Sequence, residues 1–224
     1  MSVEVHRLPV GITNCYLIKE RGLILVDAGM SQKAELLRKK LQALSISPKD
    51  VSLIVVTHAH WDHIGSLSEW KKLTGCKVAV NLREREWVEK PLKPQPRALS
   101  LWGVLVSLFS RMMAATGRFS GTPVDLTLQD DGTSLEPFGI SGKVLYTPGH
   151  TRGSMSVLLD TGDAFVGDLA MNGPLLRFGP GMPSVGDDPK AVKTSWRLLL
   201  DSGAKKIYPA HGKPFGADVL RKKL

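Results

Sequence analysis

The chain has 224 residues, of which 42% are hydrophobic and 23% charged, so a disordered, collagen-like or disulfide-dense chain is excluded and a soluble globular protein is expected. The formal net charge of +9 suits anionic partners, but basic and aromatic residues do not alternate as in an RNA-recognition module, so no stable nucleic acid partner is expected. Residues 1–9 lack the apolar core of a signal peptide, which predicts a cytoplasmic protein.

The first half of the chain predicts strands that alternate with helices. Short apolar segments predict strands at residues 3–5, 15–19, 23–26, 51–56 and 77–80. Ser31 is expected to cap a helix that runs to about Leu44. Ser66 and Glu69 have the form of a capping box for a second helix, and a third helix is predicted at residues 82–89. Both cysteines lie in apolar stretches, and we expect them to be small core residues: Cys15 and Cys76.

Residues 90–125 interrupt this pattern. Three prolines are followed by the apolar run at residues 98–109, which is shorter than the roughly 20 residues of a transmembrane helix, so no transmembrane segment is predicted. We call residues 90–125 the apolar insert. It is interpreted in three ways: as a lid or core helix over an active site, as the interface of a homodimer, or as a membrane-surface anchor.

The second half is richer in strands. Strands are predicted at residues 144–147, 155–159, 164–166 and 206–208. Pro189 suits the first turn of a helix that runs to about Leu200. The Gly- and Pro-rich loop at residues 171–188 is expected either to border the site or to be a plain surface loop. We predict a single domain over residues 1–224.

Five of the six histidines lie in motifs where predicted strands end. Residues 57–63 read Thr-His-Ala-His-Trp-Asp-His, and further histidines follow in Pro-Gly-His-Thr and Pro-Ala-His-Gly. The candidate metal ligands are His58, His60, Asp62, His63, His150, Asp168 and His211. Seven nitrogen and oxygen donors suffice for two divalent metal ions, for which we expect zinc, although iron or manganese also accepts these ligands. A carboxylate between two ions can bridge them, and Asp168 is the candidate.

The chain resembles the metallo-β-lactamase-fold superfamily. The similarity rests on five motifs in family order, at residues 25–29, 57–63, 147–151, 167–168 and 208–212. The resemblance implies an α/β fold, a four-layer αβ/βα sandwich with a dinuclear site at one edge of the sheets. It also implies that His58, His60 and His150 bind the first metal, that Asp62, His63 and His211 bind the second, and that Asp168 bridges. Asp27 resembles the family's acid that orients a ligand imidazole.

The set of candidate ligands narrows the choice among the branches of this superfamily. β-Lactamases of this fold commonly lack either the His63-type ligand or the bridging aspartate, and flavodiiron proteins carry Glu in place of His60. The complete set resembles the glyoxalase-II-like metallohydrolases, although only thirteen residues follow His211, where glyoxalase II has a helical region that binds glutathione.

The predicted function is hydrolysis of an ester, thioester or lactone by metal-bound hydroxide, with Asp62 as the catalytic group that orients or deprotonates the water. The alternatives are a phosphodiesterase or nuclease on the same metals, and a mononuclear iron sulfur dioxygenase. The apolar insert predicts a small-molecule substrate with a hydrophobic arm.

Overall fold

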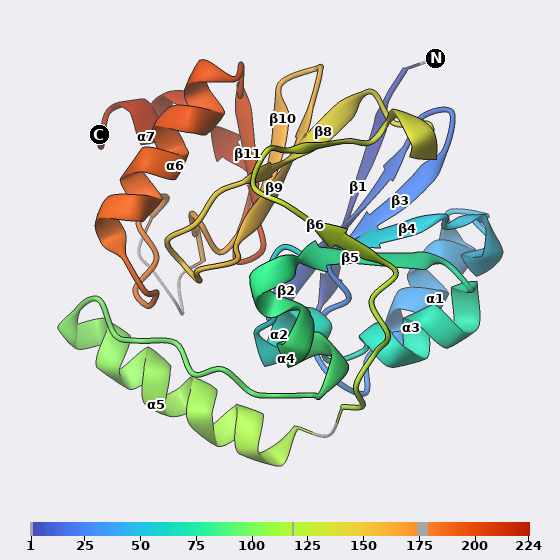
Figure 1. Ribbon diagram of the computed structural model, residues 1–224, viewed down its shortest axis with the longest axis horizontal. Coiled ribbons are helices and arrows are strands. Elements are labelled where there is room, and N and C mark those ends of the chain that lie inside the picture. The colour runs from blue at the N-terminus through green and yellow to red at the C-terminus, as the bar shows by residue number, and fades with distance from the viewer. Residues whose placement is uncertain (1, 118, 174–178) are drawn as a thin grey trace.

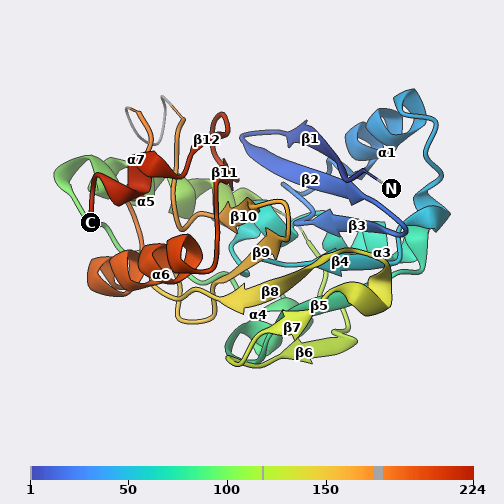
Figure 2. The ribbon, with the colours of Figure 1, turned by 90° about the horizontal axis from the view of Figure 1, so that it is seen from above.

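The computed structural model describes residues 2–117, 119–173 and 179–224. Two six-stranded sheets lie face to face between helices (Figures 1 and 2). The first sheet has the order β1 (Glu4–Val10), β2 (Thr13–Lys19), β3 (Leu23–Val26), β4 (Leu53–Val55), β5 (Lys77–Asn81) and β6 (Leu126–Leu128). The second has the order β12 (Phe215–Gly216), β11 (Lys206–Pro209), β10 (Asp163–Gly167), β9 (Met155–Leu159), β8 (Gly142–Tyr146) and β7 (Thr133–Ser134).

The described part of the chain forms seven helices, four of which make the outer layers. The seven are α1 (Ala34–Ala43), α2 (Trp61–Ile64), α3 (Leu67–Thr74), α4 (Arg85–Glu89), α5 (Leu101–Thr116), α6 (Pro189–Asp201) and α7 (Asp218–Arg221), with 3₁₀ turns at Pro48–Asp50, Leu82–Glu84 and Glu136–Phe138. Helices α1 and α3 cover the first sheet, and α6 and α7 cover the second (Figure 1). This confirms the predicted αβ/βα sandwich.

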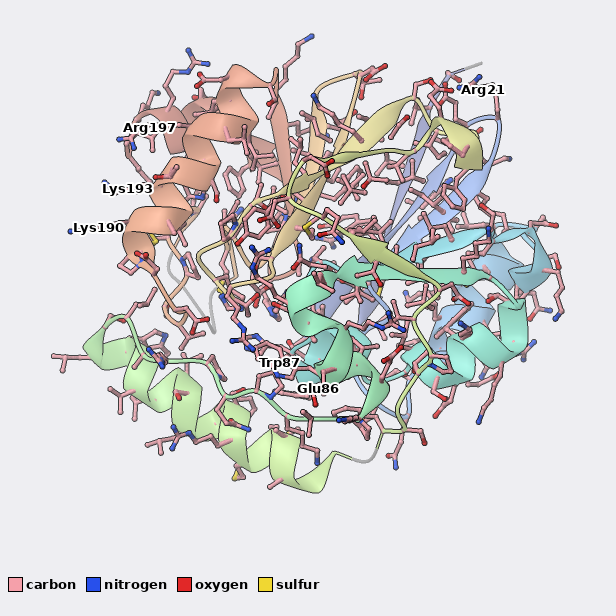
Figure 3. All side chains as sticks on the ribbon, viewed as in Figure 1. Arg21, Glu86, Trp87, Lys190, Lys193 and Arg197 are labelled. Atoms are coloured by element: carbon pink, nitrogen blue, oxygen red, sulfur yellow. The ribbon has the colours of Figure 1, made fainter. Side chains whose placement is uncertain are left out.

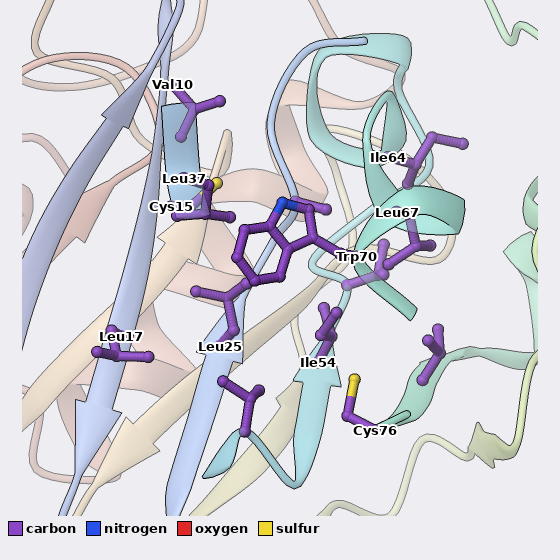
Figure 4. Packing of buried hydrophobic residues seen from close by; sticks show 14 of the residues in the cluster. Val10, Cys15, Leu17, Leu25, Leu37, Ile54, Ile64, Leu67, Trp70 and Cys76 are labelled. Carbon is purple, nitrogen blue, oxygen red and sulfur yellow. The ribbon is translucent and has the colours of Figure 1, made fainter. Parts of the chain in front are cut away.

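Three hydrophobic clusters hold the four layers together. Side chains alternate between the two faces of a strand, so in β4 Ile54 faces the helices while Leu53 and Val55 face the other sheet. Trp70 of α3 is fully buried among the residues between the first sheet and its helices (Figure 4). Both cysteines are buried free thiols, as predicted.

Two predicted helix caps are wrong. Helix α1 begins after Lys33, and no side chain caps it. Ser66 does precede α3 but makes no capping hydrogen bond. Its hydroxyl instead donates to the carbonyl of Met30 at 2.5 Å and accepts from the backbone N–H of Lys33 at 3.2 Å. A tertiary contact that joins the starts of α1 and α3 has replaced the local cap.

The apolar insert forms helix α5, whose first turn is capped by the Ser100 hydroxyl. The helix lies across the end of the sandwich, beneath α2 and α4 (Figure 1). Val106 and Ala114 are buried, whereas Leu101, Leu105 and Leu108 on its outer face are exposed. No helix in the described residues is long and apolar enough to cross a membrane.

Candidate metal centre

All seven predicted ligands lie together at one end of the sheets, because each follows the end of a strand. His58 follows β4, His150 follows β8, Asp168 follows β10 directly, and His211 follows β11. Rigid strands thereby direct four loops at one point. All seven side chains are buried. They lie close together although more than 150 residues separate His58 from His211 in the sequence.

The first cluster consists of His58, His60, His150 and Asp168. The Nδ1 atom of His60 lies 3.0 Å from the Nε2 atoms of both His58 and His150. The Oδ2 atom of Asp168 lies 3.9 Å from His58 Nε2 and 3.5 Å from His150 Nε2. Ligand atoms placed tetrahedrally at 2.0–2.2 Å from a zinc ion are roughly 3.3–3.6 Å apart, so these separations suit one ion.

The second cluster consists of Asp62, His63 and His211. His211 Nε2 lies 3.2 Å from Asp62 Oδ2, and His63 Nε2 lies 3.8 Å from the same oxygen. The other carboxylate oxygen of Asp168, Oδ1, lies 3.5 Å from His63 Nε2 and 3.3 Å from His211 Nε2. Asp168 therefore presents one oxygen to each cluster, which is the arrangement of a bridging ligand.

Hydrogen bonds behind the imidazoles fix their tautomers. His150 Nδ1 donates to the carbonyl of Val185 at 3.0 Å, and His211 Nδ1 donates to that of Ile12 at 2.9 Å. His63 Nδ1 donates to Asp27 at 2.8 Å. Because Nδ1 carries the proton in each ring, the lone pair of Nε2 faces the centre, as metal binding requires.

Asp27 has the supporting position that the resemblance implies. Besides His63, its carboxylate accepts the backbone N–H of Thr57 at 2.8 Å and the Thr57 hydroxyl. Its own backbone has a positive φ of 62°, a conformation that aspartate tolerates better than most residues. Gly167 is required nearby, because a Cβ there would lie 2.5 Å from Thr57 Oγ1.

The charges of the centre suit metal cations. Burial and the neighbouring His150 lower the pKa of His60 to about 3, so it stays in the neutral form that binds metals. Burial alone would lower the pKa of His211, but Asp168 and Asp62 outweigh it and raise this pKa to about 10. The carboxylates of Asp62 and Asp168 thus attract a positive charge, which a divalent ion supplies.

Two buried atoms of the centre are consistent with metal binding. His63 Nε2 and Asp168 Oδ1 are buried polar atoms without a hydrogen-bond partner in the described part of the chain. Such groups are costly to bury unsatisfied. Both atoms point at the second cluster, where a metal would satisfy them.

Glu84 is a site residue that the sequence analysis missed. This buried glutamate accepts hydrogen bonds from the backbone N–H of Ala59, between two ligand histidines, and from Thr151 and Gly153 beyond His150. Burial raises its pKa to about 7. Glu84 ties together the two loops that supply the first cluster. Only its place in a predicted helix was visible in the sequence, because its partners are distant in the chain.

A small cavity of about 40 Å³ opens above the ligands. Its polar wall includes Asp62 and Asp168, and its apolar wall includes Val106 and Phe109 of α5 together with Met171 and Val185. The Trp61 indole N–H donates to the Ser110 hydroxyl of α5 at 3.0 Å. Helix α5 thus lies over the centre. Met171 and Val185 of the loop at residues 171–188 also line this cavity. Residues 174–178 of the loop lie outside the described part of the chain.

Residues 8–211 match the family model described as the metallo-beta-lactamase superfamily. "Probable metallo-hydrolase YflN" of Bacillus subtilis is 30% identical over 172 residues, which are 72% of this chain and 62% of that relative. The match thus spans less than two thirds of YflN. "Probable metallo-hydrolase MJ0888" of Methanocaldococcus jannaschii is 25% identical over 200 residues, covering 89% of this chain and 87% of the relative.

Solved structures show the same fold. The BLEG-1 B3 metallo-beta-lactamase aligns with a TM-score of 0.72 and 22% identity over 96% of this chain and 95% of that chain. The metallo-beta-lactamase family protein TTHA1429 of Thermus thermophilus aligns with a TM-score of 0.68 and 22% identity over 99% of this chain and 78% of that chain. At this identity the likeness concerns the fold alone.

Proposed function

Because the chain belongs to the metallo-β-lactamase superfamily, we propose that it is a dinuclear metal-dependent hydrolase of an ester, thioester or lactone. The observation that carries the proposal is the pair of buried ligand clusters that share Asp168. Two relatives named as metallo-hydrolases support the reaction class. The complete set of seven donors supports the glyoxalase-II-like branch, and zinc is the metal we expect.

The first cluster would hold one metal through His58, His60 and His150, and the second would hold the other through Asp62, His63 and His211. When bound, such a pair lowers the pKa of a coordinated water and polarises the bond to be cleaved. The chain's residues keep the donors in place: Asp27, Val185 and Ile12 hold the imidazole tautomers.

Asp62 is the proposed proton acceptor. It lines the cavity, and its Oδ2 accepts a hydrogen bond from the Thr13 hydroxyl at 3.0 Å. Burial would raise its pKa, but His63 and His211 outweigh this and hold the pKa below the ordinary value. The carboxylate is therefore ionised at neutral pH, and the hydrogen bond from Thr13 fixes its orientation.

The cavity above the ligands is too small for an acyl chain, since about 40 Å³ holds only a few water molecules. A hydrophobic substrate arm, which the apolar insert predicts, would fit into this small cavity only if α5 shifts. Val106 and Phe109 of α5 line the cavity over the ligands, and we therefore propose α5 as the lid.

The test is metal analysis of the purified protein followed by a panel of esters, thioesters, lactones and phosphodiesters. We expect about two zinc ions per chain and hydrolysis of at least one carbonyl substrate. One iron per chain with oxygen uptake on a persulfide, or hydrolysis of phosphodiesters alone, would contradict the proposal. His6, which lies outside both clusters, provides a control: His6→Ala should retain the metal content of the unaltered protein.

A further inference from the structure

A second, larger cavity lies beside the metal centre. Its volume is about 420 Å³, and it is lined by His60, Trp87, Gln95, Arg97, Arg152 and Asp187 among others. His60 also lines the small cavity over the ligands. The two cavities are therefore adjacent at His60, and the larger one is within the size range of small-molecule sites.

Arg152 is oriented by an aromatic ring. Its guanidinium carbon lies 5.0 Å from the ring centroid of Trp87. Trp87 belongs to α4 (Figure 3). This cation–π contact holds the guanidinium beside the indole ring, and a guanidinium held in this way still has N–H groups that can bind an oxygen anion. The backbone carbonyl of Arg152 accepts the Tyr146 hydroxyl at 2.9 Å. The positive charge of Arg152 is thus held in place two residues after the candidate ligand His150.

Arg97 is fixed to the same region from the other side. Its carbonyl accepts the backbone N–H of Gly186 at 2.8 Å. Gly186 itself packs against His150, because a Cβ at Gly186 would lie 3.2 Å from the Cα of His150. The start of the apolar insert is therefore joined by its backbone to the loop of a metal ligand, and Arg97 faces the cavity.

The cavity has an excess of positive charge. Among the described residues neither Arg97 nor Arg152 forms an ion pair, whereas Arg21, Arg38 and Arg83 each pair with an acid. The wall of the cavity contains one carboxylate, Asp187, and two guanidinium groups. Within the described chain no ion pair joins Asp187 to Arg97 or to Arg152. Two unpaired guanidinium groups favour carboxylate or phosphate oxygens, which they can bind through paired hydrogen bonds.

We propose that this cavity binds an anionic group, a carboxylate or a phosphate, at the end of the substrate remote from the reacting bond. The inference rests on the proposed function in one respect, that the reacting bond lies at the metal centre. Anion binding itself requires no hydrolysis, so the two proposals can fail separately.

The kinetic test compares two 4-nitrophenyl esters of equal chain length with the zinc-loaded protein: the neutral pentanoate and the glutarate monoester, which ends in a carboxylate. We expect the protein to have the lower KM for the glutarate ester. Because a hydrogen bond to a charged group contributes roughly 1.5–3 kcal/mol, Arg97→Gln and Arg152→Gln should each change the ratio of the two KM values by about tenfold or more. Arg197→Gln, on the outer face of α6 (Figure 3), is the matched control and should leave the ratio unchanged. An identical ratio in all four proteins would overturn the proposal.

A binding test covers the case in which neither ester is hydrolysed. Propylphosphonate, butyrate and the neutral butyramide are titrated by calorimetry into the unaltered protein and into Arg97→Gln/Arg152→Gln. We expect at least one anion to bind more tightly than butyramide, to bind more weakly as NaCl is raised, and to lose this binding in the double variant. The anion that binds identifies phosphate or carboxylate chemistry. Equal binding by the double variant, or no preference for either anion over butyramide, would refute the anion site.

Discussion

At the scale of single residues, Asp168 is the one candidate ligand that contributes to both clusters, because its two carboxylate oxygens face different clusters. Substitution by alanine removes one donor from each proposed metal. We expect Asp168→Ala to lose at least one metal per chain and to reduce kcat by a factor of about 10² or more, since even outer partners of a ligand affect affinity or activity 10- to 100-fold.

The fold of Asp168→Ala should persist, because Asp168 belongs to none of the three hydrophobic clusters. Metal analysis and circular dichroism check this. A variant with two metals and full turnover would remove the bridging role, and Asp160→Ala, in the turn between β9 and β10, is the control for loss of an aspartate.

Glu84 gives a second prediction at this scale. In Glu84→Gln an amide N–H₂ replaces one acceptor oxygen opposite a backbone or hydroxyl donor. Leaving a buried donor unsatisfied costs roughly 1–3 kcal/mol. We expect the variant to unfold at lower urea concentration and to bind metal more weakly at the first cluster than at the second, which stepwise cobalt titration measures. Equal loss at both clusters would indicate a general loss of stability.

The effect of Glu84→Gln on stability should depend on pH. The pKa of Glu84 is about 7 in the fold against an ordinary value of 4.5, so the folded state takes up a proton between these values. The contribution of this ionisation to stability is therefore complete below pH 4.5 and is lost as the pH rises through 7, by up to about 3 kcal/mol. Urea unfolding of the metal-free proteins should show a larger deficit of the variant at pH 5 than at pH 8. A deficit independent of pH would contradict the raised pKa.

At the scale of elements, α5 determines the shape of the site. Val106 is buried and lines the small cavity, so Val106→Ala should enlarge it. We expect kcat/KM for a butyrate ester to rise several-fold relative to that for an acetate ester, at a cost of about 1–3 kcal/mol in stability. Val88→Ala, equally buried on α4 but outside the cavity, is the matched control. The same change of selectivity in both variants would exclude a specific role of α5.

Helix α5 is also apolar on its outer face, where Leu101, Leu105 and Leu108 are 91%, 57% and 57% exposed. A helix that is apolar on all sides is typical of one covered on all sides. The homodimer and membrane-surface interpretations of the insert therefore stay predictions, and neither conflicts with the lid position of the inner face.

At the scale of the whole molecule, the metal ions should contribute to stability. Removing them leaves His63 Nε2 and Asp168 Oδ1 without partners and places acids and imidazoles together without a metal cation. A ligand at 1,000 times its Kd stabilises the folded state by about 4 kcal/mol. We therefore expect chelation to lower Tm by about 10 °C, given roughly 2–4 °C per kcal/mol for a chain of this size. Scanning calorimetry before chelation, after it and after zinc is restored checks this, and an unchanged Tm with verified metal loss would contradict it.

The sequence predicted much of the fold, because buried strands are continuous apolar segments. The strands at 23–26 and 155–159 were predicted with the bounds that the structure has. The strands β6, β7 and β12 were not predicted, since segments of two or three residues carry too little periodicity to detect. The caps at Ser31 and Ser66 were wrong because a tertiary contact competes with the local hydrogen bond.

By itself the sequence identified the seven candidate metal ligands, because each lies in a short motif that follows a strand end, and such a motif is a local property. Only the tertiary structure decided which nitrogen of each imidazole faces the centre, that Glu84 joins two ligand loops, that α5 covers the site and that Arg97 and Arg152 share a cavity. These features depend on contacts between residues far apart in the chain, such as His211 with Ile12. Such contacts leave no pattern in a local stretch of sequence, because packing of the two sheets brings their partners together.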